Sequence, residues 1–383
     1  MATFVWLSTT DWDAPQFGSR QQLALGLARR GHRVLFVDVP RALHSLISDP
    51  AGTRRALGRL GKLRPEEAGL RVYTPLPVFP VYYHPIANAL NQRLLLRDIR
   101  RTLRRQGWQP DVFWTYWPNS AHLAGRLGER LAVYHCIDDL TAVRYPLVSR
   151  DRIGRMEAAL CRRVQLVFAR TEELAGRLEN VNASTFYLPG GVDAMLFDPA
   201  RVTAPSADVA ALPRPRVGFV GTLDDRLDVH ALAHLASALP DVSILLAGPV
   251  KRHLVDLRPL QQYPNVRLLP ARPHAAVPAV IAGLDVCLIP YRINCYTRGL
   301  SPLKSYEYLA MGKPVVGADL PYLRREAAHI HLASVPEEYV AHVRQRLTHP
   351  PSPEERARWA AVAGSYSWDC QVDEVERRLA EYL

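Results

Sequence analysis

Lysine is scarce in this chain. Only four of its 48 lysine and arginine residues are lysines, and two of these, Lys304 and Lys313, fall within residues 301–317. Arginine therefore supplies nearly all of the positive charge. Because an ammonium is a compact point charge, a lysine in such a chain indicates a tight polar position. Residues 301–317 are thus the first candidate for a functional segment.

Cysteine is also sparse. The five cysteines are odd in number and nowhere form a C-x-x-C pair. This pattern argues against a zinc site and a disulfide framework, and it favours free thiols in a reducing cytosol.

Long apolar runs are missing as well. No stretch approaches the roughly 18 uninterrupted apolar residues that a membrane-spanning helix needs. At the amino terminus no basic region precedes the apolar run, and Asp11 and Asp13 follow it closely. These residues predict a first strand and not a signal peptide. We therefore expect a cytoplasmic protein, and attachment to the inner membrane face is the alternative.

The length of 383 residues favours two domains, and the net charge is +11 with a pI near 9.6. Such a charge calls for a negative partner, and nucleotide-sugars, anionic lipids and nucleic acid all qualify. Nucleic acid is disfavoured because the sequence contains no recognised binding module.

Part of the positive charge lies in residues 91–108, where six arginines alternate with leucine and isoleucine at helical spacing. One interpretation is an amphipathic helix that lies on an anionic membrane surface. The other is a sheet-packing helix whose arginines are solvated. The sequence leaves both open.

Apolar strands alternate with helical patterns along most of the chain, which predicts α/β domains with doubly wound parallel sheets. We expect a first domain over residues 1–200, a proline-rich linker, and a second domain over residues 211–364. Residues 365–383 predict a final amphipathic helix. Residues 42–86 are rich in proline and arginine and predict an irregular insertion.

Residues 301–317 predict a short helix that leads into a buried strand. Ser301 is placed to cap it, Pro302 suits its first position, and Gly312 suits its left-handed end. Lys304 and the first amides could then hold a phosphate, while Glu307 could accept hydrogen bonds from ribose hydroxyls. The alternative is an ordinary surface helix.

This segment resembles the donor-binding segment of retaining, nucleotide-sugar-dependent glycosyltransferases of family 4. The resemblance implies a GT-B fold, in which two Rossmann-like domains face a cleft and the last helix crosses back to the first domain. Glu307 matches the family's ribose-binding glutamate. The family's other glutamate, eight residues earlier, is replaced by Gly299, where Thr297 or Arg298 are the candidate substitutes.

Further donor-binding residues are expected around the first strand of the second domain. Gly221 allows a close approach of backbone to a bound group, and Thr222 offers a hydroxyl. The resemblance implies a basic pair after this turn. Only Arg226 can supply one member of it, and pairing with Asp224 or Asp225 is the alternative for Arg226. The resemblance also places the base near His274. The expected donor-binding set is Gly221, Thr222, Arg226, His274, Ser301, Pro302, Leu303, Lys304 and Glu307.

The first domain is expected to bind the acceptor. His135 ends an apolar strand, where parallel sheets bind ligands, and it resembles the family's cleft histidine. Asp138 is the second candidate at this place, and Gly18 matches the family's glycine-bearing loop. Asp11 and Asp13 form a literal D-x-D, but after the first strand they are expected to line the acceptor site or to be solvated. We therefore expect His135, Arg226 and Lys304 to be catalytic, without a metal or other cofactor.

The function that this resemblance implies is transfer of a sugar from a nucleotide diphosphate sugar of the UDP or GDP type to a glycan or lipid-linked acceptor, with retention. The setting would be cell-surface polysaccharide or glycolipid synthesis. A nucleotide-sugar epimerase of the same fold is an alternative. So is a catalytically impaired nucleotide-sugar-binding protein, because one glutamate and one basic residue of the family pattern are missing.

Overall fold

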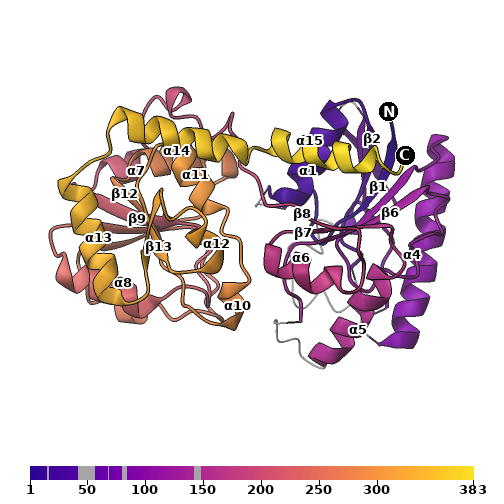
Figure 1. The fold of residues 1–383 in the computed structure, drawn as a ribbon, viewed down its shortest axis with the longest axis horizontal. Coiled ribbons are helices and arrows are strands. Elements are labelled where there is room, and N and C mark those ends of the chain that lie inside the picture. Colours follow the sequence, from indigo (N-terminus) through magenta and orange to yellow (C-terminus); the bar gives the residue numbers. More distant parts are fainter. Residues whose placement is uncertain (15–16, 42–56, 68, 80–83, 142–147) are drawn as a thin grey trace. The chain divides into compact units, whose positions relative to one another are not determined.

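The computed structural model describes residues 1–14, 17–41, 57–67, 69–79, 84–141 and 148–383. The chain forms two compact units (Figure 1). The first unit is Met1–Pro189 together with Gln371–Leu383, and the second is Gly190–Cys370. Each unit is an α/β structure with its own sheet, as the alternation of strands and helices predicts.

The sheet of the first unit has the order β3-β4-β2-β1-β5-β6-β7-β8 within the described residues. Its strands pair in parallel except β3, which is antiparallel to β4. The central strands are buried along their length, because helices cover both faces of a parallel sheet. The strands are β1 (Thr3–Leu7), β2 (Arg33–Val37), β3 (Leu63–Glu67), β4 (Leu70–Tyr73), β5 (Val112–Thr115), β6 (Leu131–Cys136), β7 (Leu166–Ala169) and β8 (Thr185–Tyr187).

The helices of the first unit are α1 (Ser19–Arg29), α4 (Pro85–Gln106), α5 (Arg150–Cys161) and α6 (Glu172–Glu179). The basic segment predicted over residues 91–108 lies in α4. Its leucine and isoleucine stripe, which includes Leu95, Ile99 and Leu103, belongs to the core of the unit, and its arginines are exposed. This stripe therefore packs on protein, as the sheet-packing interpretation requires.

The prediction of an irregular insertion over residues 42–86 is wrong in its second half. β3 and β4 form there and extend the sheet beyond β2, and Pro85 begins α4. Proline normally argues against a strand, but Pro65 lies in β3, which is an edge strand where a missing N–H is tolerated. Residues 42–56, 68 and 80–83 of this segment lie outside the described residues.

The second unit has a sheet of order β11-β10-β9-β12-β13-β14 within the described residues, and its neighbouring strands pair in parallel. The strands are β9 (Arg216–Val220), β10 (Ser243–Ala247), β11 (Val266–Leu269), β12 (Val286–Ile289), β13 (Val315–Ala318) and β14 (Ile330–Ala333). The helices are α7 (Ala207–Ala210), α8 (Val229–Ala238), α9 (Val277–Ala282), α10 (Cys295–Arg298), α11 (Lys304–Ala310), α12 (Pro321–Arg324), α13 (Pro336–Thr348) and α14 (Pro353–Ser365).

The last helix, α15 (Trp368–Leu379), carries the chain from the second unit into the first. Its end lies beside α1 (Figure 1). There Glu376 accepts a hydrogen bond from His32 Nε2 at 2.8 Å, and Val372 packs on Gly26 so closely that a Cβ at Gly26 would lie 2.6 Å from it. A glycine in the middle of α1 thus makes room for the carboxyl-terminal helix.

Strand order reverses once in each sheet, between β1 and β5 and between β9 and β12. In open parallel sheets, ligands bind beyond the carboxyl ends of the strands at such a reversal. Each unit therefore has one topologically favoured place for a site.

Candidate functional site

Helix α11 follows β12, one of the two strands between which the strand order of the second unit reverses. The helix begins later than the sequence predicts. Its first residue is Lys304 and its N-cap is Leu303, so Ser301 does not cap it and Pro302 is not its first residue. The reason is local: the Ser305 hydroxyl and amide both donate to the Pro302 carbonyl, at 2.8 and 3.1 Å, which draws Pro302 into a turn before the helix. The Ser301 hydroxyl is buried and has no hydrogen-bond partner among the described residues.

The predicted end of this helix is confirmed. Gly312 has φ +63°, and its N–H donates to the Leu309 carbonyl at 2.9 Å. The next N–H, that of Lys313, donates to the Tyr308 carbonyl at 3.0 Å. Glycine is favoured here because other residues rarely adopt a left-handed conformation.

α11 is a buried helix and not an ordinary surface helix. Tyr306, Tyr308 and Leu309 are fully buried, and the Tyr306 ring stacks on Tyr366 at 4.1 Å. The Tyr308 hydroxyl accepts a hydrogen bond from the Val220 N–H at 2.9 Å, at the end of β9. These contacts fix α11 against the turn that follows β9.

The two charged residues of α11 meet at this turn. The Lys304 ammonium donates to the Glu307 carboxylate at 2.7 Å, and both side chains are largely buried. Gly221 lies against the lysine, since a Cβ at Gly221 would be 3.3 Å from Lys304 Cε and 2.7 Å from Phe219 Cζ. A side chain at this position would crowd the space beside the ammonium.

His274 belongs to the same cluster. Burial lowers the pKa of His274, and the charges of Glu307, Lys304 and Asp193 also act on it. Its ring packs edge-to-face on Phe197 at 5.5 Å. We call Gly221, His274, Lys304 and Glu307 the β9–α11 cluster, and it lies at the strand reversal of the second unit.

The Arg226 guanidinium is paired with a neighbouring carboxylate. It donates to both oxygens of Asp224, at 2.7 and 2.6 Å, and lies over the Tyr291 ring at 5.4 Å. Burial alone would lower the pKa of Arg226, but Asp224 and Tyr291 raise it above its ordinary value. The pairing alternative for Arg226 is therefore the arrangement that the structure shows. Thr222 is half-buried in the same turn.

The position of the missing glutamate is open to a side chain. Gly299 has φ −84°, and a Cβ there would meet its nearest neighbour, the Tyr296 carbonyl oxygen, at 3.7 Å. Thr297 is fully buried, and its hydroxyl is held by the Arg292 carbonyl in the cap of α10. Of the two candidate substitutes, only Arg298 is exposed.

In the first unit, the two acids of the D-x-D are held by arginines. Asp11 pairs with Arg41 and accepts from the Val39 N–H at 3.2 Å, while Asp13 pairs with Arg64 at 2.9 Å. Neither carboxylate is simply solvated. Gly18 is the N-cap of α1, with open space where its Cβ would be.

His135 is buried at the end of β6, at 2% exposure, and neither of its ring nitrogens has a hydrogen-bond partner among the described residues. Burial, with Arg170 and Arg20 nearby, holds the pKa of His135 well below its ordinary value. The imidazole is therefore neutral at pH 7. Asp138 lies just beyond the strand end and is half-buried.

Sequence reasoning missed Arg20, Arg170 and Tyr116, which surround His135. Tyr116 and Arg170 directly follow β5 and β7, and Arg20 lies in the first turn of α1; this place at the carboxyl edge of the sheet was the available signal.

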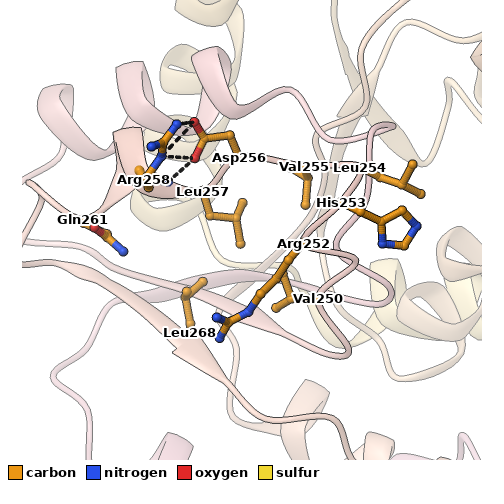
Figure 2. A pocket seen from close by; sticks show the side chains of 10 residues that line it. All are labelled: Val250, Arg252, His253, Leu254, Val255, Asp256, Leu257, Arg258, Gln261 and Leu268. Atoms are coloured by element: carbon orange, nitrogen blue, oxygen red, sulfur yellow. Dashed lines mark hydrogen bonds and ion pairs between the residues drawn. The ribbon is translucent and has the colours of Figure 1, made fainter.

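The second unit also has an open pocket of about 580 Å³, whose lining includes no residue of the β9–α11 cluster (Figure 2). In it Arg258 is bound to Asp256, and Leu254 and Leu268 are 47% and 48% exposed. The pocket lies along the edge strand β11 and contains none of the predicted site residues. We therefore assign no ligand to it. Its lining is Val250, Arg252, His253, Leu254, Val255, Asp256, Leu257, Arg258, Gln261 and Leu268.

Parts of the chain are similar in sequence to known proteins. Residues 214–349 match the sequence family described as Glycosyl transferases group 1. The "Putative teichuronic acid biosynthesis glycosyltransferase TuaH" of Bacillus subtilis (strain 168) is 34% identical over 106 residues, which span 27% of this chain and 27% of that protein.

Solved structures match over the whole chain. Sucrose-phosphate synthase from Thermosynechococcus elongatus is similar with a TM-score of 0.73 at 16% identity, over 100% of this chain and 99% of that one. HepE of Anabaena, in complex with UDP and glucose, is similar with a TM-score of 0.68 at 15% identity, over 100% of both chains. At such identities the likeness shows the fold. The fold is that of the GT-B glycosyltransferases, as expected, and the family match supports a glycosyltransferase.

Proposed function

We propose that this protein is a glycosyltransferase that takes a sugar from a nucleoside diphosphate sugar bound in its second unit. The observation that carries the proposal is the β9–α11 cluster. A scarce lysine, a carboxylate and a glycine backbone converge beyond the carboxyl ends of β9 and β12. This is the chemistry that a pyrophosphate and a ribose need.

In this proposal the Lys304 ammonium and the backbone at Gly221 bind the pyrophosphate. The hydroxyls of Thr222 and Ser301 add hydrogen bonds, and Pro302 and Leu303 shape the turn that precedes α11. Glu307 accepts from the ribose hydroxyls. Lys304 then exchanges part of its contact with Glu307 for the phosphate oxygens, which offer stronger charge-assisted bonds.

His274 contributes a wall for the nucleobase. It is partly buried against Phe197 and sits within reach of the charges of Lys304 and Glu307. HepE, one of the similar structures, was solved with UDP and glucose, which supports a donor of the UDP type.

The chemical step we propose proceeds with retention. The departing diphosphate carries the developing negative charge, and a fixed cation aimed at that charge lowers the barrier. Lys304 supplies this cation, and Arg226 adds to it if it shares its charge between Asp224 and the diphosphate. His135, neutral and buried in the first unit, orients the sugar or the acceptor by hydrogen bonds.

We further propose that the acceptor is a glycan or lipid-linked glycan of the cell surface. The relative named for teichuronic acid biosynthesis supports this setting.

We propose an anionic membrane as the place of action, through the outer face of α4. Ile86, Leu90 and Leu94 recur every four residues on this helix and are 76%, 42% and 39% exposed. Arg97 and Arg101 lie on the same face and form no ion pair with any described residue. Exposed apolar and basic side chains on one helix face are typical of interfacial binding. Within the described residues, no helix is long and apolar enough to cross a bilayer.

Vesicle sedimentation tests this face. We expect the chain to sediment with phosphatidylglycerol-containing vesicles and much less with phosphatidylcholine alone. The double variant Ile86→Asn, Leu90→Asn should lose this binding, whereas Leu254→Asn, which removes an exposed leucine of the second unit, should keep it. Equal sedimentation of both variants would contradict the proposal.

One incubation separates the three candidate activities. The full chain is mixed with UDP-glucose or GDP-mannose, with and without a membrane glycolipid extract, and the products are resolved by mass. A transferase releases free nucleoside diphosphate and adds a hexose to the extract. An epimerase changes the sugar without releasing nucleotide. Binding without turnover, seen as a raised melting temperature alone, would mark an impaired enzyme and overturn the proposal.

A further inference from the structure

Two arginines of the first unit are placed together without a carboxylate partner. Arg20 lies in the first turn of α1, and Arg170 directly follows β7. Within the described residues neither guanidinium forms an ion pair, although this chain pairs many of its other arginines with acids. Asp138 is near enough to act on the charge of Arg20 but does not contact it.

The neighbours of these arginines are buried polar groups. The Arg20 guanidinium lies over the Tyr116 ring at 5.5 Å, and the Tyr116 ring lies 5.0 Å from that of His135. Tyr116 and His135 are each 2% exposed. The Tyr116 hydroxyl, both His135 nitrogens and Arg20 Nε have no hydrogen-bond partner among the described residues.

Arg170 is held toward this group. Its side chain donates to the Ser19 hydroxyl, and its N–H donates to the Cys136 carbonyl at 2.9 Å. The residues therefore converge from α1, β5, β6 and β7, beyond the carboxyl ends of the strands at the reversal between β1 and β5. We call Arg20, Tyr116, His135 and Arg170 the first-unit cluster.

This arrangement is unfavourable for the chain on its own. Burial, and then the charge of Arg170, lower the pKa of Arg20 to about 10. Buried charges normally find a counter-ion, and buried polar groups normally find hydrogen-bond partners. Here two half-buried guanidinium groups have no carboxylate partner among the described residues. The buried Tyr116 hydroxyl and the two His135 nitrogens have no hydrogen-bond partner there either. A group with negative charge and several acceptor oxygens would supply both.

We infer that the first-unit cluster binds an oxyanion carried by the sugar acceptor, either a phosphate ester or a carboxylate. That the bound molecule is the sugar acceptor rests on the proposed function, in which Lys304 binds the diphosphate of the donor. Arginine matches both anions because its planar fork can donate two parallel hydrogen bonds. Tyr116 and His135 complete the contact with one hydroxyl and one imidazole N–H.

Binding of small probes tests the inference without any transfer reaction. Calorimetry on the full chain, at constant ionic strength, compares glucose 6-phosphate, glucuronate and uncharged glucose. We expect one of the two anionic sugars to bind at least tenfold more tightly than glucose, and the stronger of the two identifies the anion. Arg20→Gln and Arg170→Gln should each weaken that binding at least tenfold. Arg155→Gln, which removes an exposed arginine of α5, should leave it unchanged.

Melting temperatures without ligand provide an independent readout. Since the charge of Arg170 acts unfavourably on that of Arg20 and no described carboxylate pairs with either, Arg20→Gln and Arg170→Gln should melt at or above the temperature of the unaltered chain. A purely structural role for the arginines predicts a lower melting temperature and would overturn the inference. So would anionic sugars that bind no better than glucose.

The two proposals fail separately. If UDP raises the melting temperature but neither anionic sugar binds, the acceptor inference is wrong and the donor site stands. If an anionic sugar binds, Arg20→Gln removes that binding and UDP has no effect, then the oxyanion site stands and the donor assignment is wrong.

Discussion

The Lys304 ammonium and the Glu307 carboxylate are 2.7 Å apart, one turn from each other on α11, and they form an ion pair where a nucleotide would need them separately. The pair keeps both charges neutralised in a partly buried place until a ligand competes for them. Substitution of either residue is thus expected to weaken nucleotide binding.

Replacing either residue should abolish nucleotide binding. UDP at about 100 times its dissociation constant stabilises a chain by roughly 2.7 kcal/mol. Lys304→Ala and Glu307→Ala should each remove most of the corresponding rise in melting temperature, because one loses the phosphate contact and the other the ribose contact. Lys251→Ala, at an exposed lysine of the second unit, is the matched control. A full rise in both variants would refute the assignment.

Releasing Arg226 should strengthen donor binding. In the unaltered chain the Arg226 backbone N–H donates to Asp224 Oδ1 at 3.2 Å. Asp224→Asn keeps an oxygen that can accept this hydrogen bond but removes the negative charge that holds the guanidinium. A cation freed beside a diphosphate contributes charge-assisted hydrogen bonds, so the affinity for UDP should rise by about tenfold. Calorimetry measures this change. An unchanged affinity would show that Arg226 takes no part in the donor site.

Glutamate should be tolerated at Gly299. The backbone there suits any residue and the nearest atom is 3.7 Å from a Cβ, so Gly299→Glu should change the free energy of unfolding by less than about 0.5 kcal/mol. If the new carboxylate contacts the sugar, UDP-glucose should gain affinity while UDP alone does not. An equal change for both ligands would contradict a contact with the sugar.

Alanine should not be tolerated at Gly248, although this glycine makes no polar contact with the cluster. Its φ is +147°, and a Cβ would lie 2.0 Å from the Gly221 carbonyl oxygen. Gly248→Ala should therefore lower the free energy of unfolding by about 2 kcal/mol or more and displace the turn at Gly221. Gly299→Ala is the control and should melt like the unaltered chain. Denaturant titration of both decides the matter.

Asp38 should make stability depend on pH. Burial raises the pKa of this carboxyl to about 6, against hydrogen bonds from Trp12 and Thr74 that lower it. The fold thus favours the protonated form, and the stability contributed by Asp38 falls as pH rises from about 4 to 6. Asp38→Asn removes this loss. The variant should gain up to about 3 kcal/mol over the unaltered chain above pH 6 and nothing below pH 4. Chemical denaturation at both pH values measures the difference, and a constant difference would contradict it.

Local patterns predicted the buried strands well. β1 runs over Thr3–Leu7, at the expected first strand, because a short continuous apolar run is typical of a buried strand in a parallel sheet. The end of α11 was predicted for the same kind of reason, since Gly312 supplies a conformation that few residues adopt. The start of α11 was predicted wrongly, because Ser301 has the side chain of a typical N-cap. The hydrogen bond from the Ser305 hydroxyl to the Pro302 carbonyl instead forms a turn there, and the helix begins after it.

Long-range partners were beyond the reach of the sequence. The sequence offered the pairing of Arg226 with Asp224 as an alternative, because the two residues are close in the chain. Nothing local indicated that Arg20 lies over the Tyr116 ring and beside Arg170. The edge strand β3 was also missed, because it contains Pro65 and little apolar periodicity. The strand reversal that collects Arg20, His135 and Arg170 depends on pairing between strands far apart in the chain.

The most direct measurement is a crystal of the full chain soaked with UDP. The account predicts the pyrophosphate against Gly221 and the Lys304 ammonium, with the ribose hydroxyls within hydrogen-bond distance of Glu307. Nucleotide density elsewhere, for example in the pocket lined by Arg252 and Leu268, would contradict it.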